Sequence, residues 1–156
     1  MKSLAAILLL LLSANAIAQS SSADSACGPA YVAFKVTKDK LQHPTPTPQD
    51  GKALVYLYGW GTLALDGKAL GAVSQSYSVL EVDPGEHHLC AWAPGGPLKG
   101  LPLFSTALHS LNAKSGETYY FDLDTTTRFV LKLNLVDPDE GKHMVGSLPF
   151  STSRPK

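Results

Sequence analysis

Charged residues are scarce in this 156-residue chain, and neither sign dominates. Lysine and arginine number 13, aspartate and glutamate number 13, and together they make up 17% of the residues. A protein that binds nucleic acid electrostatically needs a basic surplus to neutralise phosphates. The composition therefore argues against nucleic-acid binding.

Familiar catalytic motifs are also missing. There is no Gly-x-Ser-x-Gly elbow, and Gly95-Gly96 lacks the Lys-Ser/Thr that completes a phosphate-binding loop. Asp122 and Asp124 share one face of a predicted strand beside a turn, but they form no recognisable acid–base pair. We predict that the protein is not an enzyme and carries no cofactor.

Five histidines are the candidates for metal binding. His87 and His88 are neighbours on a predicted strand, so their side chains point to opposite faces and cannot chelate together. A site would need another histidine brought in by the fold. We predict no metal site, and the five candidates are His43, His87, His88, His109 and His143.

Only one long apolar run is present, at residues 4–12, and it follows the basic start Met1-Lys2. Ala16-Ile17-Ala18 fits the small-x-small cleavage pattern of a signal peptide, so residues 1–18 are predicted to be removed after Ala18. An uncleaved anchor is the alternative, although the run is shorter than the roughly 20 residues that span a bilayer. We expect a secreted or periplasmic protein without a membrane span.

Cysteine occurs only twice, at Cys27 and Cys90. In an exported chain, one disulfide is the natural pairing. Two free thiols, with Cys90 buried in a strand, are the alternative. Lipidation of Cys27 is disfavoured, because Asp24-Ser25-Ala26 separates it from the apolar run.

Turn-forming residues are plentiful, with 13 glycines and 11 prolines, and no segment has a convincing amphipathic helical pattern. Asp66-Gly67 between two apolar runs predicts a hairpin, and Asp83-Pro84-Gly85 predicts another turn. Eight or nine short antiparallel strands predict an all-β fold, a single Ig-like or PEGA-like β-sandwich or small barrel. The strands are expected at 31–37, 53–60, 63–65, 69–73, 77–82, 87–93, 104–113, 118–123 and 129–135, with a weak last strand at 142–148.

The predicted domain organisation is simple. A loose leader at 19–28 precedes one domain at 29–150, which contains a proline-rich loop at 38–52. Residues 151–156 are expected to be a flexible tail.

Aromatic residues recur at alternate positions of the segment 53–60. If Val55 and Leu57 face the core, then Tyr56, Tyr58 and Trp60 share the opposite face. They could form an exposed binding strip for a sugar ring or a protein partner. Alternatively, the tyrosines lie inside a sandwich, or the loop at 94–102 covers the strip.

Several segments together resemble a known family. They are Gly51-Lys52-Ala53-Leu54-Val55-Tyr56, Asp66-Gly67-Lys68 with Gly71, Tyr77, Pro84-Gly85-Glu86-His87 and Gly116-Glu117-Thr118-Tyr119-Tyr120. Their order is similar to that of a bacterial exported β-sandwich family of unknown function, and the Pro-Gly-Glu-His turn is similar to that of PEGA modules. The resemblance implies a β-sandwich at the cell envelope and brings no catalytic residues. Members often carry an arginine where this chain has Gly59-Trp60-Gly61.

The expected function is therefore a non-enzymatic structural or protein-interaction role at the cell envelope, with an unidentified envelope protein as partner. The alternative is a carbohydrate- or small-ligand-binding module that uses Tyr56, Tyr58 and Trp60 and binds a glycan.

Overall fold

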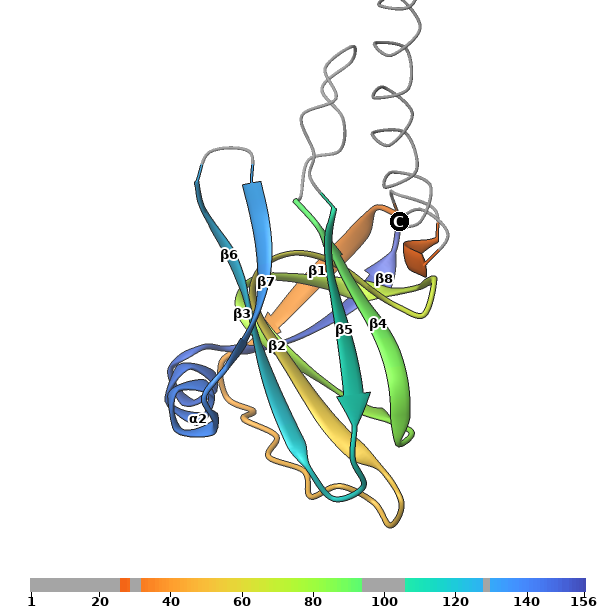
Figure 1. Ribbon diagram of the computed structural model, residues 1–156. Coiled ribbons are helices and arrows are strands. Elements are labelled where there is room, and N and C mark those ends of the chain that lie inside the picture. The colour runs from red at the N-terminus through yellow and green to blue at the C-terminus, as the bar shows by residue number, and fades with distance from the viewer. Residues whose placement is uncertain (1–25, 29–31, 94–105, 128–129) are drawn as a thin grey trace, which may run out of the picture.

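The computed structural model describes residues 26–28, 32–93, 106–127 and 130–156. The predicted signal peptide, most of the predicted leader and the predicted loop at 94–102 lie outside these ranges. The described part is mostly β, with eight strands and one short helix (Figure 1). The predicted all-β fold is confirmed in part, because the described residues are mostly β-strand. A two-sheet sandwich is not confirmed, because the strands form one open, mixed sheet.

The elements follow one another in a simple order. They are β1 (Phe34–Asp39), β2 (Ala53–Leu65), β3 (Lys68–Val82), β4 (Gly85–Trp92), β5 (Ala107–Ala113), β6 (Thr118–Thr127), β7 (Val130–Val136), α2 (Pro138–Ser147) and β8 (Phe150–Pro155).

Strand β2 is the centre of the sheet, whose main path runs β1-β8-β3-β2-β4-β5. One edge of β2 pairs with β3 along its whole length. The other edge is divided: residues 54–59 pair in parallel with β6, and residues 62–65 pair with β4 in antiparallel fashion. The hairpin of β6 and β7 therefore diverges from the hairpin of β4 and β5 (Figure 1).

The hairpin of β2 and β3 confirms the predicted Asp-Gly turn, but its strands are longer than expected. Asp66 and Gly67 both have positive φ, at 49° and 77°, as a tight hairpin turn requires. The predicted breaks at Gly61 and near Ser74 do not occur, and β2 and β3 run for 13 and 15 residues. Two register shifts, one of them at Gln75 with φ 48°, keep the strands paired past these points.

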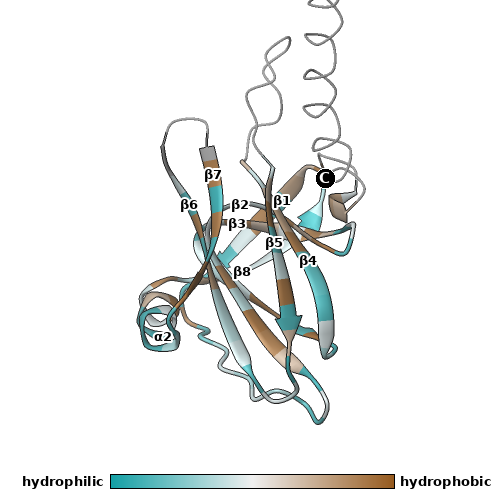
Figure 2. Cartoon of the chain, in the orientation of Figure 1, coloured by the Kyte–Doolittle hydropathy of each residue, from teal (hydrophilic) through white to brown (hydrophobic). Residues whose placement is uncertain are grey.

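Both faces of β2 are buried, as its double-sided apolar pattern predicts. Val55 and Leu57 contribute to one core, together with Phe121 of β6. Tyr56 and Tyr58 contribute to a second core on the opposite face. Hydrophobic and hydrophilic residues alternate along outer strands such as β7, which buries only one face (Figure 2).

The helix α2 is a feature that the strand prediction for 142–148 missed. Asp137 caps its N-terminus by accepting a hydrogen bond from the backbone N–H of Asp139 at 2.9 Å, and Pro138 occupies the first turn. Gly141 lies directly against the ring of Tyr120, where a Cβ atom would overlap it. Capping and this close approach favour a helix over the predicted weak strand.

The predicted flexible tail at 151–156 is wrong, because these residues lie almost entirely in β8. β8 pairs with all six residues of β1. Ser151 is buried, and the Ser153 hydroxyl accepts a hydrogen bond from the backbone N–H of Ala72 at 3.0 Å. Polar residues looked typical of a tail, but their hydroxyls satisfy backbone groups of β3.

No helix among the described residues has the length and apolar character that a membrane span requires.

Candidate functional site

The three aromatic residues of the predicted strip lie in different environments. Tyr56 and Tyr58 are buried, at 4% and 2% exposure, whereas Trp60 is 46% exposed. Val145 of α2 belongs to the same buried cluster as the two tyrosines. The strip is therefore covered over its first two members and open only at Trp60.

Tyr56 belongs to a group of stacked rings. Its ring centre lies 5.0 Å from that of Tyr120, with the two planes inclined by 14°, and 6.1 Å from that of Tyr77. Burial raises the pKa of Tyr56 to about 12, and the neighbouring Tyr120 and Tyr77 act in the same direction. Its hydroxyl is therefore neutral at physiological pH, and the group serves packing.

A cavity of about 290 Å³ lies beside these rings. Tyr56, Tyr77 and Tyr120 form its aromatic wall, and His43 and Lys142 also line it. The Tyr77 hydroxyl donates to the carbonyl of Pro44 at 3.5 Å, which connects the proline-rich segment to this wall. This volume is at the lower limit of typical ligand pockets.

A second cavity, of about 540 Å³, lies on the same face of β2 and includes the exposed Trp60. We call it the Trp60 cavity. Its volume is well within the range of small-molecule and side-chain pockets. Its walls include Tyr58 and Trp60 of β2, Gln75 of β3, Asp122 of β6, Met144 of α2, and Leu148, which directly follows α2.

The bulge of β3 at Gln75 shapes one wall of this cavity. The backbone N–H of Ser74 donates to the Ser76 hydroxyl at 3.0 Å, which donates to the Ser151 hydroxyl at 2.9 Å. The Ser151 hydroxyl in turn donates to the carbonyl of Tyr77 at 3.2 Å. Because Ser76 and Ser151 are buried, this chain of bonds holds the bulge in place and with it the cavity wall.

Asp122 is the one charged residue among the described residues that line the Trp60 cavity. Burial raises the pKa of Asp122, and the like charges of Asp124 and Glu140 act in the same direction. Burial also raises the pKa of Tyr58 to about 12, with added effects from Asp122 and Glu140. The cavity thus combines neutral aromatic walls with a negative potential.

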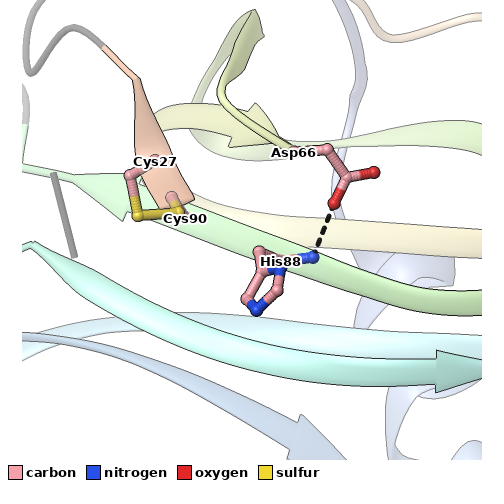
Figure 3. The surroundings of a disulfide bond; sticks show 4 residues. All are labelled: Cys27, Asp66, His88 and Cys90. Atoms are coloured by element: carbon pink, nitrogen blue, oxygen red, sulfur yellow. Dashed lines mark hydrogen bonds between the residues drawn. A yellow bond between two sulfur atoms is a disulfide. The ribbon is translucent and has the colours of Figure 1, made fainter. Parts of the chain in front are cut away.

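The predicted disulfide between Cys27 and Cys90 is confirmed, with their Cα atoms 5.6 Å apart (Figure 3). It fastens the segment before β1 to β4, next to the turn that contains Asp66. One Asp66 carboxylate oxygen accepts a bond from the backbone N–H of His88 at 2.7 Å (Figure 3). A structural disulfide indicates an oxidising, extracytoplasmic compartment.

His87 is held between two turns. Its Nδ1–H donates to the Asp66 carboxylate, and its Nε2–H donates to the carbonyl of Asp83, both at 2.7 Å. Both partners can only accept, so the doubly protonated ring satisfies both bonds. Burial lowers the pKa of His87, but these bonds outweigh burial and raise it above its usual value.

Metal binding receives no support from the histidine positions in the described residues. There, no three histidine, cysteine, aspartate or glutamate side chains converge. His43 faces the ring of Tyr77, and His109 packs edge-on against Phe121. Burial lowers the pKa of His109.

Comparison of the chain with protein-family models, with curated proteins and with solved structures finds no match. The resemblance to exported β-sandwich modules therefore stays a prediction.

No pattern in the sequence singles out Asp122, Gln75 or Met144. By its sequence context, Asp122 is a strand residue beside a turn. Its register position opposite Tyr58 in the parallel pairing of β2 and β6 brings it to the aromatic face. The alternation of β6 could have shown that Asp122 lies on the same face as Tyr120, but not that a helix would close the cavity around it.

Proposed function

We propose that this chain is an exported, non-enzymatic interaction domain that acts at the cell envelope, as a secreted or periplasmic protein. It binds an envelope protein through the Trp60 cavity. The observation that supports this proposal is the half-exposed indole of Trp60 on the wall of an open cavity of about 540 Å³.

Tryptophan is a frequent anchor of protein interfaces, because it combines a large flat apolar surface with a polar N–H. Trp60 differs from its neighbours in being open to solvent, since Tyr56 and Tyr58 are covered. Its position at the bulge places it on a rigid strand whose geometry buried serine hydroxyls maintain. A partner side chain would therefore meet a preformed surface, which lowers the entropy cost of binding.

A second candidate function is carbohydrate binding. Tyr58 and Trp60 both line the cavity, and Gln75 and Asp122 supply polar groups that could bind sugar hydroxyls. Aromatic faces and hydrogen-bonding side chains are a suitable combination for a sugar ring. The buried position of Tyr58 limits the stacking surface to Trp60, so we rank this function second.

A comparison of three forms of the mature protein tests the proposal. Wild type, Trp60→Ala and Leu135→Ala are each used to capture proteins from an envelope extract, with identification by mass spectrometry. Leu135 is the matched control, because it is an exposed apolar residue, 48% exposed, on β7. We expect one partner to be retained by wild type and Leu135→Ala and lost with Trp60→Ala.

Equal capture by all three forms would contradict the proposed site. A glycan array probed with the same forms separates the two functions. Glycan binding that depends on Trp60, without a Trp60-dependent protein partner, would favour the carbohydrate module. Thermal melting of Trp60→Ala shows whether the variant remains folded.

A further inference from the structure

We infer that the Trp60 cavity receives a cationic side chain, lysine or arginine, of the partner protein. This inference rests on the proposed function and names the chemistry of the group that is bound.

The carboxylate of Asp122 lacks a partner in the described structure. Asp122 is partly buried, and within the described part of the chain its carboxylate accepts no hydrogen bond and forms no ion pair. A partly buried carboxylate without a partner is costly, and a cation bound beside it removes that cost. Asp122 and Trp60 line the same cavity.

The charged residues around Asp122 are mainly acidic. Asp124 follows two residues later on β6, and Glu140 lies in the first turn of α2. Both act on Asp122 as like charges. Lys132 lies opposite Asp124 in the pairing of β6 and β7. Among the described residues that line the cavity, none is a lysine, arginine or histidine. The local field therefore favours a positive ligand over a neutral or negative one.

The aromatic wall of the cavity also suits a cation. An ammonium or guanidinium group over the face of tryptophan is attracted by the ring quadrupole. Met144 and Leu148 complete the apolar lining, against which the methylene stem of a lysine or arginine can pack. One long cationic side chain can thus use both the carboxylate and the apolar walls, which a sugar hydroxyl cannot.

Three blocked tripeptides, Ac-Gly-Arg-Gly-NH2, Ac-Gly-Lys-Gly-NH2 and Ac-Gly-Glu-Gly-NH2, test the inference. The readout is the indole N–H resonance of Trp60 in NMR spectra of ¹⁵N-labelled mature protein. The chain has only two tryptophans, and Trp92 is buried near the disulfide, so its resonance is an internal reference. We expect saturable shifts of the Trp60 signal with the arginine and lysine peptides and none with the glutamate peptide.

Two charge-removing variants make the test specific. Asp122→Asn keeps the shape of the side chain, and we expect it to weaken binding about tenfold or more, because a charge-assisted hydrogen bond is lost. Asp139→Asn removes the same charge from an exposed position of α2, and we expect affinity within about twofold of wild type. Thermal melting confirms that both variants fold.

No shift with the cationic peptides, an equal shift with the glutamate peptide, or equal weakening by the two variants would overturn the inference. Binding of an oligosaccharide at Trp60 in place of the cationic peptides would also overturn it, in favour of a glycan. If capture of the envelope protein still depends on Trp60 in these cases, the proposed function stands and only the cationic group is wrong. If capture is independent of Trp60, the proposed function itself fails.

Discussion

Of the two glycines in α2, Gly146 should stabilise the protein when replaced by alanine, whereas Gly141→Ala should leave the stability unchanged or lower it. Gly141 and Gly146 lie in the same helix. A Cβ atom at Gly141 would overlap the Cβ and ring atoms of Tyr120, whereas a Cβ atom at Gly146 meets nothing within 4 Å. The pair therefore separates helix propensity from packing at the face that covers the aromatic residues.

The expected magnitudes follow from these surroundings. Alanine in place of glycine favours a helix by up to about 1 kcal/mol. Gly146→Ala should therefore raise the free energy of unfolding by up to about 1 kcal/mol. At Gly141 the same gain is opposed by overpacking, which costs roughly 1–3 kcal/mol, because the Tyr120 atoms nearest the helix are close to the backbone and cannot swing away. Gly141→Ala should be neutral to about 2 kcal/mol less stable than wild type.

Urea denaturation of the protein that lacks residues 1–18, followed by circular dichroism, measures both changes. With a slope of about 2 kcal/mol per molar urea, the midpoints of the two variants should differ by about 0.5–1.5 M. Near-ultraviolet spectra should change only for Gly141→Ala, since only that variant moves the helix against the stacked Tyr56 and Tyr120. If Gly141→Ala raised the midpoint as much as Gly146→Ala, the docking of α2 on Tyr120 would be refuted. Lower midpoints for both would argue against the helix itself.

Three further predictions follow. Replacing both Cys27 and Cys90 with alanine should lower the free energy of unfolding by up to about 4 kcal/mol in the chain-entropy model, since the residues are 63 positions apart; an unchanged urea midpoint, or two titratable thiols in unfolded, unreduced wild type, would contradict the disulfide. The ion pair of His87 and Asp66 should stabilise the fold, by less than about 1 kcal/mol, between the lowered pKa of Asp66 and the raised pKa of His87. Its contribution should thus be present at mildly acidic pH and decline as pH rises through the pKa of folded His87, so wild type should exceed His87→Gln in stability by more at pH 5.5 than at pH 8.5; an equal difference at both values would refute it. Intact-mass measurement of the exported protein should show a chain that begins after Ala18, and a mass that includes residues 1–18 would disprove cleavage there.

Local chemistry in the sequence was enough to predict several features of this protein. The alternation of Val55, Tyr56 and Leu57 placed neighbouring side chains on opposite faces of β2, because a strand has a period of two. Asp66-Gly67 predicted the tight turn, because it requires positive φ. The pairing of Cys27 with Cys90 followed from there being only two cysteines.

Capping signals for α2 were also present, in Asp137 and Pro138, but the segment lacks a strong apolar periodicity and its pattern suggested a turn and a weak strand. β8 was missed for a related reason. Its serines look typical of a flexible tail. In the fold, however, the hydroxyls of Ser151 and Ser153 form hydrogen bonds with backbone and hydroxyl groups of the neighbouring β3.

The division of the aromatic strip could be decided only by the tertiary structure. A period of two tells which face Tyr56, Tyr58 and Trp60 share, but not what lies above that face. The segment after β7 forms α2, which packs on the two tyrosines, and Met144 and Leu148 of this segment line the cavity at Trp60. Parallel pairing of β6 with β2 brings Asp122 to the same cavity. These contacts join residues more than 60 positions apart, so local sequence patterns carry no information about them. They bury Tyr56 and Tyr58 and leave Trp60 46% exposed.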